Sequence, residues 1–469
     1  MKNTFRIATA ISALLIVAAP LAAQTPETAA APLEKAASDP AAVPKTEKEA
    51  AAEAAKESWT KGRKISMQYF RPQDKRGLNV FETTKVAGAE FNGFKMDVTA
   101  AFTSQVQSLS HQNGAAPNLV NGVNANQLAN IGFGFNNSTA NLALHAQIAP
   151  GIRVALTSYL SSRHHNETWV KDGYLQVDES PIDFVPLKAL MQILTLRVGH
   201  FEINYGDAHF RRSDNGNAIY NPFVGNYIMD AFTTEIGGEV YLKAKNVIAM
   251  ASVTGGEIRG TVLSPDQRGP SFIGKLGFDR QIKSDLRVRL TGSMYKADKV
   301  MSNTLYGGDR AGSRYYYVME NTTAAESAQF TSGAINPGFK NRVFAMQVNP
   351  FIKFRGLELF GVIERAEGKA TAELTERVWN QYAADVVYRF TTDEKLFVGA
   401  RYNKAEGTLA GITGDVGSSR WQLGAGWFIT PTLMMKAEYV NQKFNGYPTT
   451  SIRNGGKFNG MMLEGVIAF

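Results

Sequence analysis

The C-terminal stretch of the chain, Lys457 to Phe469, alternates between apolar and polar or small residues and ends on an aromatic side chain. A strand of this kind has one face suited to lipid and another that is free to be polar. The last strand of a membrane barrel must pair with the first, because an open sheet edge is not tolerated in hydrocarbon. The pattern therefore predicts the closing strand of a bacterial outer-membrane β-barrel, with Phe469 as the signal that the barrel-assembly machinery recognises. The predicted lipid face comprises Met461, Leu463, Gly465 and Ile467.

The N-terminus has the pattern of a secretory signal peptide. Lys2 and Arg6 precede an apolar run that ends in small residues near Ala23, as in a cleaved leader. Residues 1–23 are therefore predicted to direct export and to be removed. No later stretch approaches the ~18 uninterrupted apolar residues of a spanning helix, so any membrane crossing is expected to use strands.

Residues 24–60 are rich in Ala, Pro, Glu and Lys. This composition cannot bury enough apolar surface to fold. We expect a periplasmic linker that is disordered or, over Glu47 to Lys56, helical. Residues 61–469 are then expected to form the barrel.

From Lys64 onward, apolar residues recur with a period of two, whereas a helix would space them by three and four. The segments are about ten to twelve residues long, which is the length of a tilted strand that crosses a bilayer. One face is expected to contact lipid and the other the water of the lumen, as for Leu423 and Leu290 against Gln422 and Thr291.

Short and long connections alternate between these segments, as expected for short periplasmic turns opposite long external loops. Counting strands back from Phe469 gives sixteen, starting near Asn92. Two earlier segments, Ile65 to Arg71 and Leu78 to Thr83, either raise the count to eighteen or lie in the lumen or periplasm. The tight connections are Pro150-Gly151, Lys243 to Asn246, Lys283 to Asp285, Arg355-Gly356, Thr391 to Glu394 and Thr430 to Thr432, and the long ones include Gly206 to Ala231, Gly255 to Pro270, Ala297 to Asn341 and Lys443 to Gly456.

Composition argues against several classes of function. Cysteine is absent, so the chain has no disulfide, thiolate metal site or cysteine nucleophile. The net charge of +8 comes without a basic block interleaved with aromatic residues, so nucleic acid is not an expected partner. The six His form no set with metal-ligand spacing. We expect no metal, no cofactor and no enzymatic activity.

A long insertion from Tyr205 to Phe232 carries charged and aromatic residues. Long ordered loops are usually functional, and a sixteen-stranded barrel encloses water unless something narrows it. The loop is expected to fold inward and form the constriction, while an external cap is the alternative. Its charged residues are Asp207, Arg211, Arg212 and Asp214.

Alternation also directs charged wall residues into the lumen, with basic and acidic groups in nearly equal number. The slight basic excess favours anions weakly. The basic wall residues expected to line the pore include Arg153, Arg197, Arg287 and Arg289.

The segment L-R-V-G-H-F-E-I-N-Y-G (Leu196 to Gly206), followed by R-R-S-D-N-G (Arg211 to Gly216), resembles phosphate-selective porins of the Gram-negative outer membrane. The resemblance implies a sixteen-stranded channel that is often trimeric, so a homotrimer is expected. The arginine ladder and lysine cluster of the phosphate-specific members are not recognisable here, and phosphate specificity is not expected.

These patterns together predict an outer-membrane porin through which small hydrophilic solutes diffuse passively, surrounded by outer-membrane lipid and lipopolysaccharide. One alternative is a non-conducting barrel that serves as an adhesin or scaffold. A second alternative is an outer-membrane enzyme.

Overall fold

A computed structural model describes residues 70–83, 91–163, 167–244, 246–256, 268–300, 302–308, 314–325 and 333–469. The predicted signal peptide and linker lie outside these residues, as does Ile65 to Arg71 except for its last two positions.

The described residues contain long strands, two 3-10 turns and one short helix. The strands are β1 (Lys95–Gln112), β2 (Leu119–Val120), β3 (Val123–Asn124), β4 (Phe133–Phe135), β5 (Thr139–Ala149), β6 (Ile152–Ser161), β7 (Trp169–Val177), β8 (Leu194–Glu202), β9 (Thr234–Ala244), β10 (Val247–Thr254), β11 (Ser271–Lys283), β12 (Leu286–Ala297), β13 (Arg342–Phe354), β14 (Leu357–Lys369), β15 (Arg377–Phe390), β16 (Leu396–Gly407), β17 (Val416–Thr430), β18 (Leu433–Asn445) and β19 (Lys457–Ala468). The others are η1 (Lys75–Gly77), α3 (Val185–Met191) and η2 (Ala208–Phe210).

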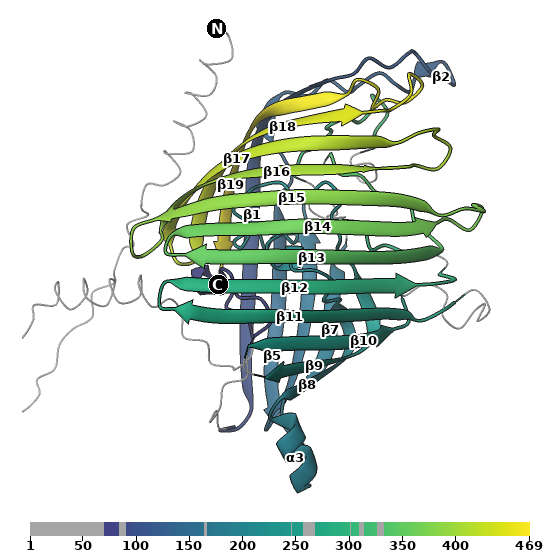
Figure 1. Ribbon diagram of the computed structural model, residues 1–469. Helices are drawn as coiled ribbons and strands as arrows, with labels where there is room; N and C mark the ends of the chain where they lie inside the picture. Colours follow the sequence, from purple (N-terminus) through teal and green to yellow (C-terminus); the bar gives the residue numbers. More distant parts are fainter. Residues whose placement is uncertain are drawn as a thin grey trace, which may run out of the picture. The chain divides into compact units, whose positions relative to one another are not determined.

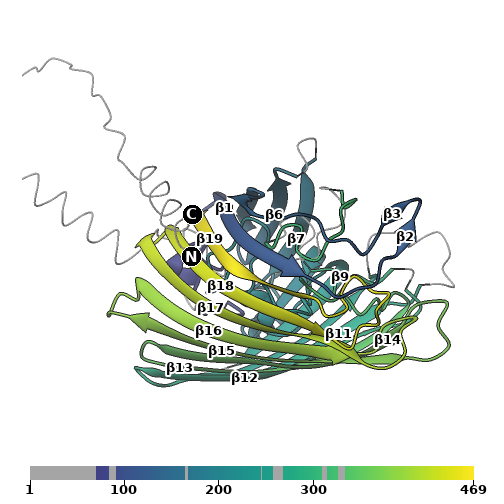
Figure 2. The same cartoon turned by 90° about the horizontal axis from the view of Figure 1, so that it is seen from above.

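The sheet closes on itself. Each strand from β5 to β19 pairs antiparallel with the next, and β19 pairs with β1 from Ala101–Ala468 to Gln112–Lys457. β1 also pairs with β5 and, further along, with β4, so β4 and β5 together act as one interrupted strand. Within the described residues this is a closed barrel of sixteen strands (Figure 1), and Figure 2 shows β1 and β19 side by side at the closure.

The predicted count of sixteen strands is confirmed. The alternative of eighteen is wrong, because Leu78 to Thr83 forms no strand. These residues lie inside the barrel instead, where Asn79 donates a hydrogen bond to Glu358 of β14 at 2.5 Å.

Alternation assigns the two faces of the sheet as predicted. On β17, Trp421, Leu423 and Trp427 are about half exposed on the outside, while Arg420 and Gln422 are buried on the inside. Apolar side chains facing outward and polar ones facing inward are the arrangement of a barrel in lipid.

All six predicted tight connections join neighbouring strands at one end of the barrel, here called the tight-turn end. The exception at this end is the β7–β8 connection, which contains α3. The long connections emerge at the opposite, long-loop end. Among the described residues, no helix has the length and apolar character needed to cross a bilayer.

The inward face is expected from the sequence to contact the water of the lumen, but its side chains are largely covered. Gln422 and Thr291 point inward, yet their relative exposures are 0% and 1%. Gln422 donates to Glu438 at 2.9 Å and Thr291 donates to Asp207 at 2.8 Å. Segments outside the sheet occupy the interior and cover these side chains.

A charged residue on the outer face should be costly at the middle of a strand. We expect Leu423→Arg to lower the free energy of unfolding by about 2–4 kcal/mol, because it puts a guanidinium in the bilayer midplane. The matched control is Leu374→Arg in the β14–β15 connection, where the leucine is 95% exposed. Urea titration of protein refolded into lipid vesicles measures both, and equal midpoints would contradict the assignment of the lipid face.

Candidate functional site in the charged interior of the barrel

The connection between β8 and β9, residues 203–233, crosses the interior and is called the inner loop. Its backbone is held by side chains of β15 to β18. Gln381 accepts from the Met229 N–H at 2.8 Å and donates to the Met229 carbonyl at 2.9 Å. Lys436 donates to three carbonyl groups, those of Ala218, Asn221 and Phe223, at 2.9–3.1 Å.

The inner loop also contacts the next part of the wall, beyond β19. Thr103 of β1 donates to the Gly216 carbonyl at 2.7 Å, and Asn141 of β5 accepts from the Gly216 N–H at 2.9 Å. A Cβ at position 216 would lie 2.5 Å from the Cα of Ala140, so the close approach requires glycine. The loop therefore spans the lumen from β8 and β9, where it begins and ends, to β15–β18, and continues along the wall to β1 and β5.

A four-residue ion cluster joins the inner loop, the wall and the N-terminal segment, which is residues 70–83. Asp207 of the loop and Glu82 of the segment both pair with Lys275 of β11, at 2.7 and 2.9 Å. Both carboxylates also pair with Arg289 of β12, at 2.8 and 2.7 Å. All four side chains are at most 2% exposed. Buried charges need such partners, because desolvation of each ion is expensive.

A second cluster lies around Glu358 of β14. This carboxylate accepts from Arg389 at 2.7 Å and from Arg211 of the inner loop at 3.5 Å. Asn79 of the N-terminal segment bridges the cluster, since it also accepts from Arg211. The Asn79 carbonyl in turn accepts from Arg287 of β12 at 2.8 Å.

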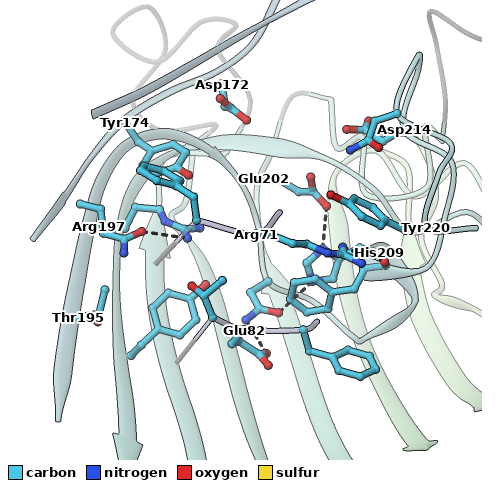
Figure 3. Close-up of a pocket in the computed structure, with 18 of the residues that line it drawn as sticks. Arg71, Glu82, Asp172, Tyr174, Thr195, Arg197, Glu202, His209, Asp214 and Tyr220 are labelled. Atoms are coloured by element: carbon cyan, nitrogen blue, oxygen red, sulfur yellow. Dashed lines mark hydrogen bonds and ion pairs between the residues drawn. The ribbon is translucent and has the colours of Figure 1, made fainter. Parts of the chain in front are cut away.

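Open space lies between the N-terminal segment, the inner loop and the wall from β5 to β9. Two adjoining cavities of about 220 and 160 Å³ share several lining residues, including Arg71, Lys171, Asp172 and Asp214. In Figure 3, Tyr174 and Arg197 lie on one side of the larger cavity, and Glu202, His209 and Tyr220 lie on the other. Charged groups of both signs and aromatic rings therefore surround the same cavity, which is large enough to hold several water molecules.

Lys171 enters this cavity through a β-bulge. The register of β6 and β7 passes from Thr157–Asp172 to Ser158–Val170, which leaves Lys171 without an opposite residue. A bulge lets two successive side chains point to one face, and both Lys171 and Asp172 line the cavity. Lys171 pairs with Glu202 at 2.6 Å and with Asp214 at 2.7 Å.

The predicted site residues all face the interior, but most are buried in ion pairs rather than exposed to water. Arg211 and Arg212 are only 2% and 3% exposed and do not stand in open water. Both are buried next to carboxylate partners. The partner of Arg212 is Asp230 of the same loop, and the partner of Arg211 is Glu358 on the wall. The pairs are Arg153–Asp178, Arg197–Glu239, Asp207–Lys275, Arg211–Glu358, Arg212–Asp230, Asp214–Lys171, Arg287–Asp279 and Arg289–Asp207.

Burial and neighbouring charges change the pKa values of several groups outside the spanning strands, among them Arg71, Glu82 and His209. Burial lowers the pKa of Arg71 to about 10, against the opposing effect of Tyr220 and Glu202. Burial would raise the pKa of Glu82, but Lys275 and Arg289 outweigh it and hold that pKa well below its usual range. Burial also lowers the pKa of His209. At neutral pH the cavity thus contains a charged Arg71 and a neutral His209.

Sequence reasoning gave the lumen as one of the possible places for Leu78 to Thr83, but it did not identify the contacts that hold residues 70–83 there. It missed Lys171, because a bulge breaks the alternation that places side chains. Over the residues that the structure describes, no group of three or more His, Asp or Glu is arranged to hold a metal ion.

A closed antiparallel sheet with an apolar outer face and a charged inner face defines a membrane-spanning β-barrel.

Comparison with protein-family models and with curated proteins found no match. Among solved structures, the chain is similar to OmpT, an outer membrane protein of Vibrio cholerae, with 11% identity over 81% of this chain and 99% of that one, and a TM-score of 0.47. The anion-selective porin from Comamonas acidovorans has 11% identity over 80% of this chain and 100% of that one, with a TM-score of 0.48. The outer membrane channel DcaP of Acinetobacter baumannii has 9% identity over 82% and 100%, also with a TM-score of 0.48. Because these scores are below 0.5, the strand pairing of this chain is what establishes its fold.

The buried ion cluster makes a testable prediction about stability. Asp207→Asn leaves Lys275 with Glu82, and Arg289 with Glu82 and Asp279. We expect the loss of the charge-assisted hydrogen bonds of Asp207 to lower the free energy of unfolding by about 1.5–3 kcal/mol. The matched control is Glu406→Gln, which removes an exposed partner of Lys404 and should cost only about 0–1 kcal/mol. Both are measured by urea titration in lipid vesicles, and similar small losses would show that the cluster contributes little.

Proposed function

We propose that this chain is an outer-membrane porin through which small hydrophilic solutes diffuse passively. The observation that carries the proposal is the closed sixteen-stranded barrel, whose inner wall is charged and still borders cavities of about 220 and 160 Å³. Barrels of this strand number are wide enough for an aqueous channel. An inner loop that spans the lumen supports a role for residues 203–233 in narrowing that channel.

A weak preference for anions is the finer part of the proposal. Five basic residues line the larger cavity against four acidic ones. Such a small excess supports only modest selectivity, because the opposite charges lie within a few ångströms of each other. The basic residues are Arg71, Lys171, Arg197, Arg212 and Lys243, and the acidic residues are Glu82, Asp172, Glu202 and Asp214.

The cellular setting is proposed as well. A leader over residues 1–23 supports export, and the apolar outer face supports outer-membrane lipid and lipopolysaccharide as surroundings. We further propose that the barrel-assembly machinery recognises Phe469 and that the porin assembles as a homotrimer. Under this proposal the tight-turn end faces the periplasm.

The filled interior favours one other function, a barrel that does not conduct. Side chains such as Trp379, Arg401 and Gln442 on the inner wall are fully buried, and a barrel closed by its own segments would serve as a scaffold. Conductance in planar bilayers separates the two functions, since a scaffold gives no current steps.

Charge in the cavity should determine the ion preference. In a salt gradient, we expect the reversal potential of the wild type to have the sign that indicates a preference for anions. Asp172→Asn should shift this potential further in the same direction, because Asp172 lines both cavities and its carboxylate repels anions. The matched control is Asp183→Asn, which removes an exposed carboxylate in the β7–β8 connection. Absence of current would exclude a porin, and equal shifts in the two variants would place the conduction path elsewhere.

Loss of the terminal aromatic side chain should impair assembly but not transport. The backbone of Phe469 exchanges two hydrogen bonds of 2.9 Å with Ala100, and its ring is 43% exposed. We expect Phe469→Ala to lower the yield of heat-modifiable barrel in outer-membrane fractions, with the unit conductance of folded protein unchanged. Phe354→Ala is the matched control, since Phe354 is 42% exposed at the same end. Equal yields for the two variants would show that Phe469 is not the assembly signal.

A further inference from the structure

The N-terminal segment, residues 70–83, lies across the tight-turn end of the barrel. Its contacts run round the wall at positions near the tight turns. Phe70 stacks on His145 of β5 at 4.1 Å between ring centroids, and the Lys75 N–H donates to the Pro431 carbonyl at 2.9 Å. Other contacts are with Arg153 of β6, Lys243 of β9, Arg287 of β12 and Glu358 of β14. The segment therefore touches opposite walls of the lumen.

The segment fills this space without belonging to the sheet. Phe81 is 2% exposed, and its ring lies 5.3 Å from that of Phe351 and 4.3 Å from the Arg289 guanidinium. Since β1 begins at Lys95 and residues 70–83 form no strand, removal of the segment would break no strand pairing. The ring of paired strands can therefore remain intact whether the segment lies inside the lumen or outside it.

The wall charges that hold the segment keep a second partner without it. Lys275 and Arg289 pair with Asp207 as well as with Glu82. Glu358, which accepts from Asn79, also pairs with Arg389 at 2.7 Å. Departure of the segment therefore leaves none of these three wall charges without an opposite charge, which avoids the largest cost of opening a buried ion cluster.

The segment also covers three of the basic residues that the sequence places in the pore. Asn79 accepts from Arg211 and Arg287, and Glu82 pairs with Arg289. The segment carries Arg71, Lys75 and Arg76 against Asp74 and Glu82, so its departure takes one net positive charge from the lumen. The three guanidinium groups then border the water that replaces the segment and keep their wall and loop partners Glu358, Asp279 and Asp207. The open lumen would thus be wider than the closed one.

We propose that residues 70–83 are a removable plug that closes the channel at its tight-turn end, and that its displacement opens the lumen to hydrophilic solutes. The inference rests on the proposed function as a porin. It adds an internal gate that the porin proposal alone does not contain.

A reversible cross-link tests the plug directly in the full-length chain. The hydrogen bond from Lys75 to Pro431 brings the two backbones within reach of a disulfide, whose Cα atoms lie about 4.4–6.8 Å apart. The chain has no cysteine of its own, so Lys75→Cys with Pro431→Cys forms a single defined pair. We expect loss of the open-channel current on oxidation and its recovery on addition of reductant in the same bilayer, with no response from either single variant.

The outcomes separate the plug from the porin. Current that is equal in oxidised and reduced protein, with the cross-link verified by thiol labelling, would overturn the plug and leave the porin intact. Failure of the cross-link to form would overturn the position of the segment. A lack of current in both states and in the wild type would overturn the proposed function and the plug together.

A second variant opens the plug in place of locking it. Glu82→Gln removes the carboxylate that holds the segment to Lys275 and Arg289, and we expect the open fraction to rise about tenfold. Glu367→Gln is the matched control, because Glu367 pairs with the 51% exposed Arg365 outside the lumen. An unchanged open fraction in folded Glu82→Gln protein would contradict the plug even if the cross-linked pair could not be produced.

Discussion

Closure of the sheet is the constraint on which the rest of the structure depends. A spanning sheet must leave no unpaired edge in hydrocarbon, and here the pairing of β1 with β19 meets that condition. Sixteen strands enclose more space than their own side chains fill. The chain therefore brings backbone into the lumen, and that backbone needs partners of its own. Inward side chains such as Lys436 and Gln381 provide them, so the same wall residues that would face water in an empty barrel serve as hydrogen-bond partners for the inner loop.

The second consequence of the filled lumen is electrostatic. Charged wall residues lose contact with water and must be neutralised locally. Arg401 pairs with Asp385 at 2.7 Å and Lys436 pairs with Glu464 at 2.5 Å, each with almost no exposure. The basic and acidic residues of the inner wall, which are nearly equal in number, therefore form discrete ion pairs and do not form opposed basic and acidic surfaces. The cavities beside β5 to β9 keep charged groups of both signs next to open space.

The sequence predicts the wall of the barrel well and its contents poorly. Period-two alternation depends only on neighbouring residues and on the medium outside, so the faces of β17 and the tight turn at Arg355-Gly356 follow from local pattern. Lys171 does not follow, because one inserted residue reverses the alternation at the bulge. Arg211 and Glu82 do not follow either. Their burial depends on residues more than a hundred positions away, and no local pattern records which carboxylate meets which cation.

Burial of the Asp207 cluster determines how the interior responds to ionic strength. Salt shortens the reach of exposed charges, from about 8 Å at physiological concentration to about 3 Å at 1 M, and a pair such as Lys404–Glu406 weakens accordingly. Dissolved ions cannot enter between Lys275, Arg289 and Asp207, whose side chains are fully covered. The arrangement of the lumen is therefore expected to persist from dilute to concentrated media. Changes in salinity alter the flow of ions through the barrel but are not the stimulus that rearranges its interior.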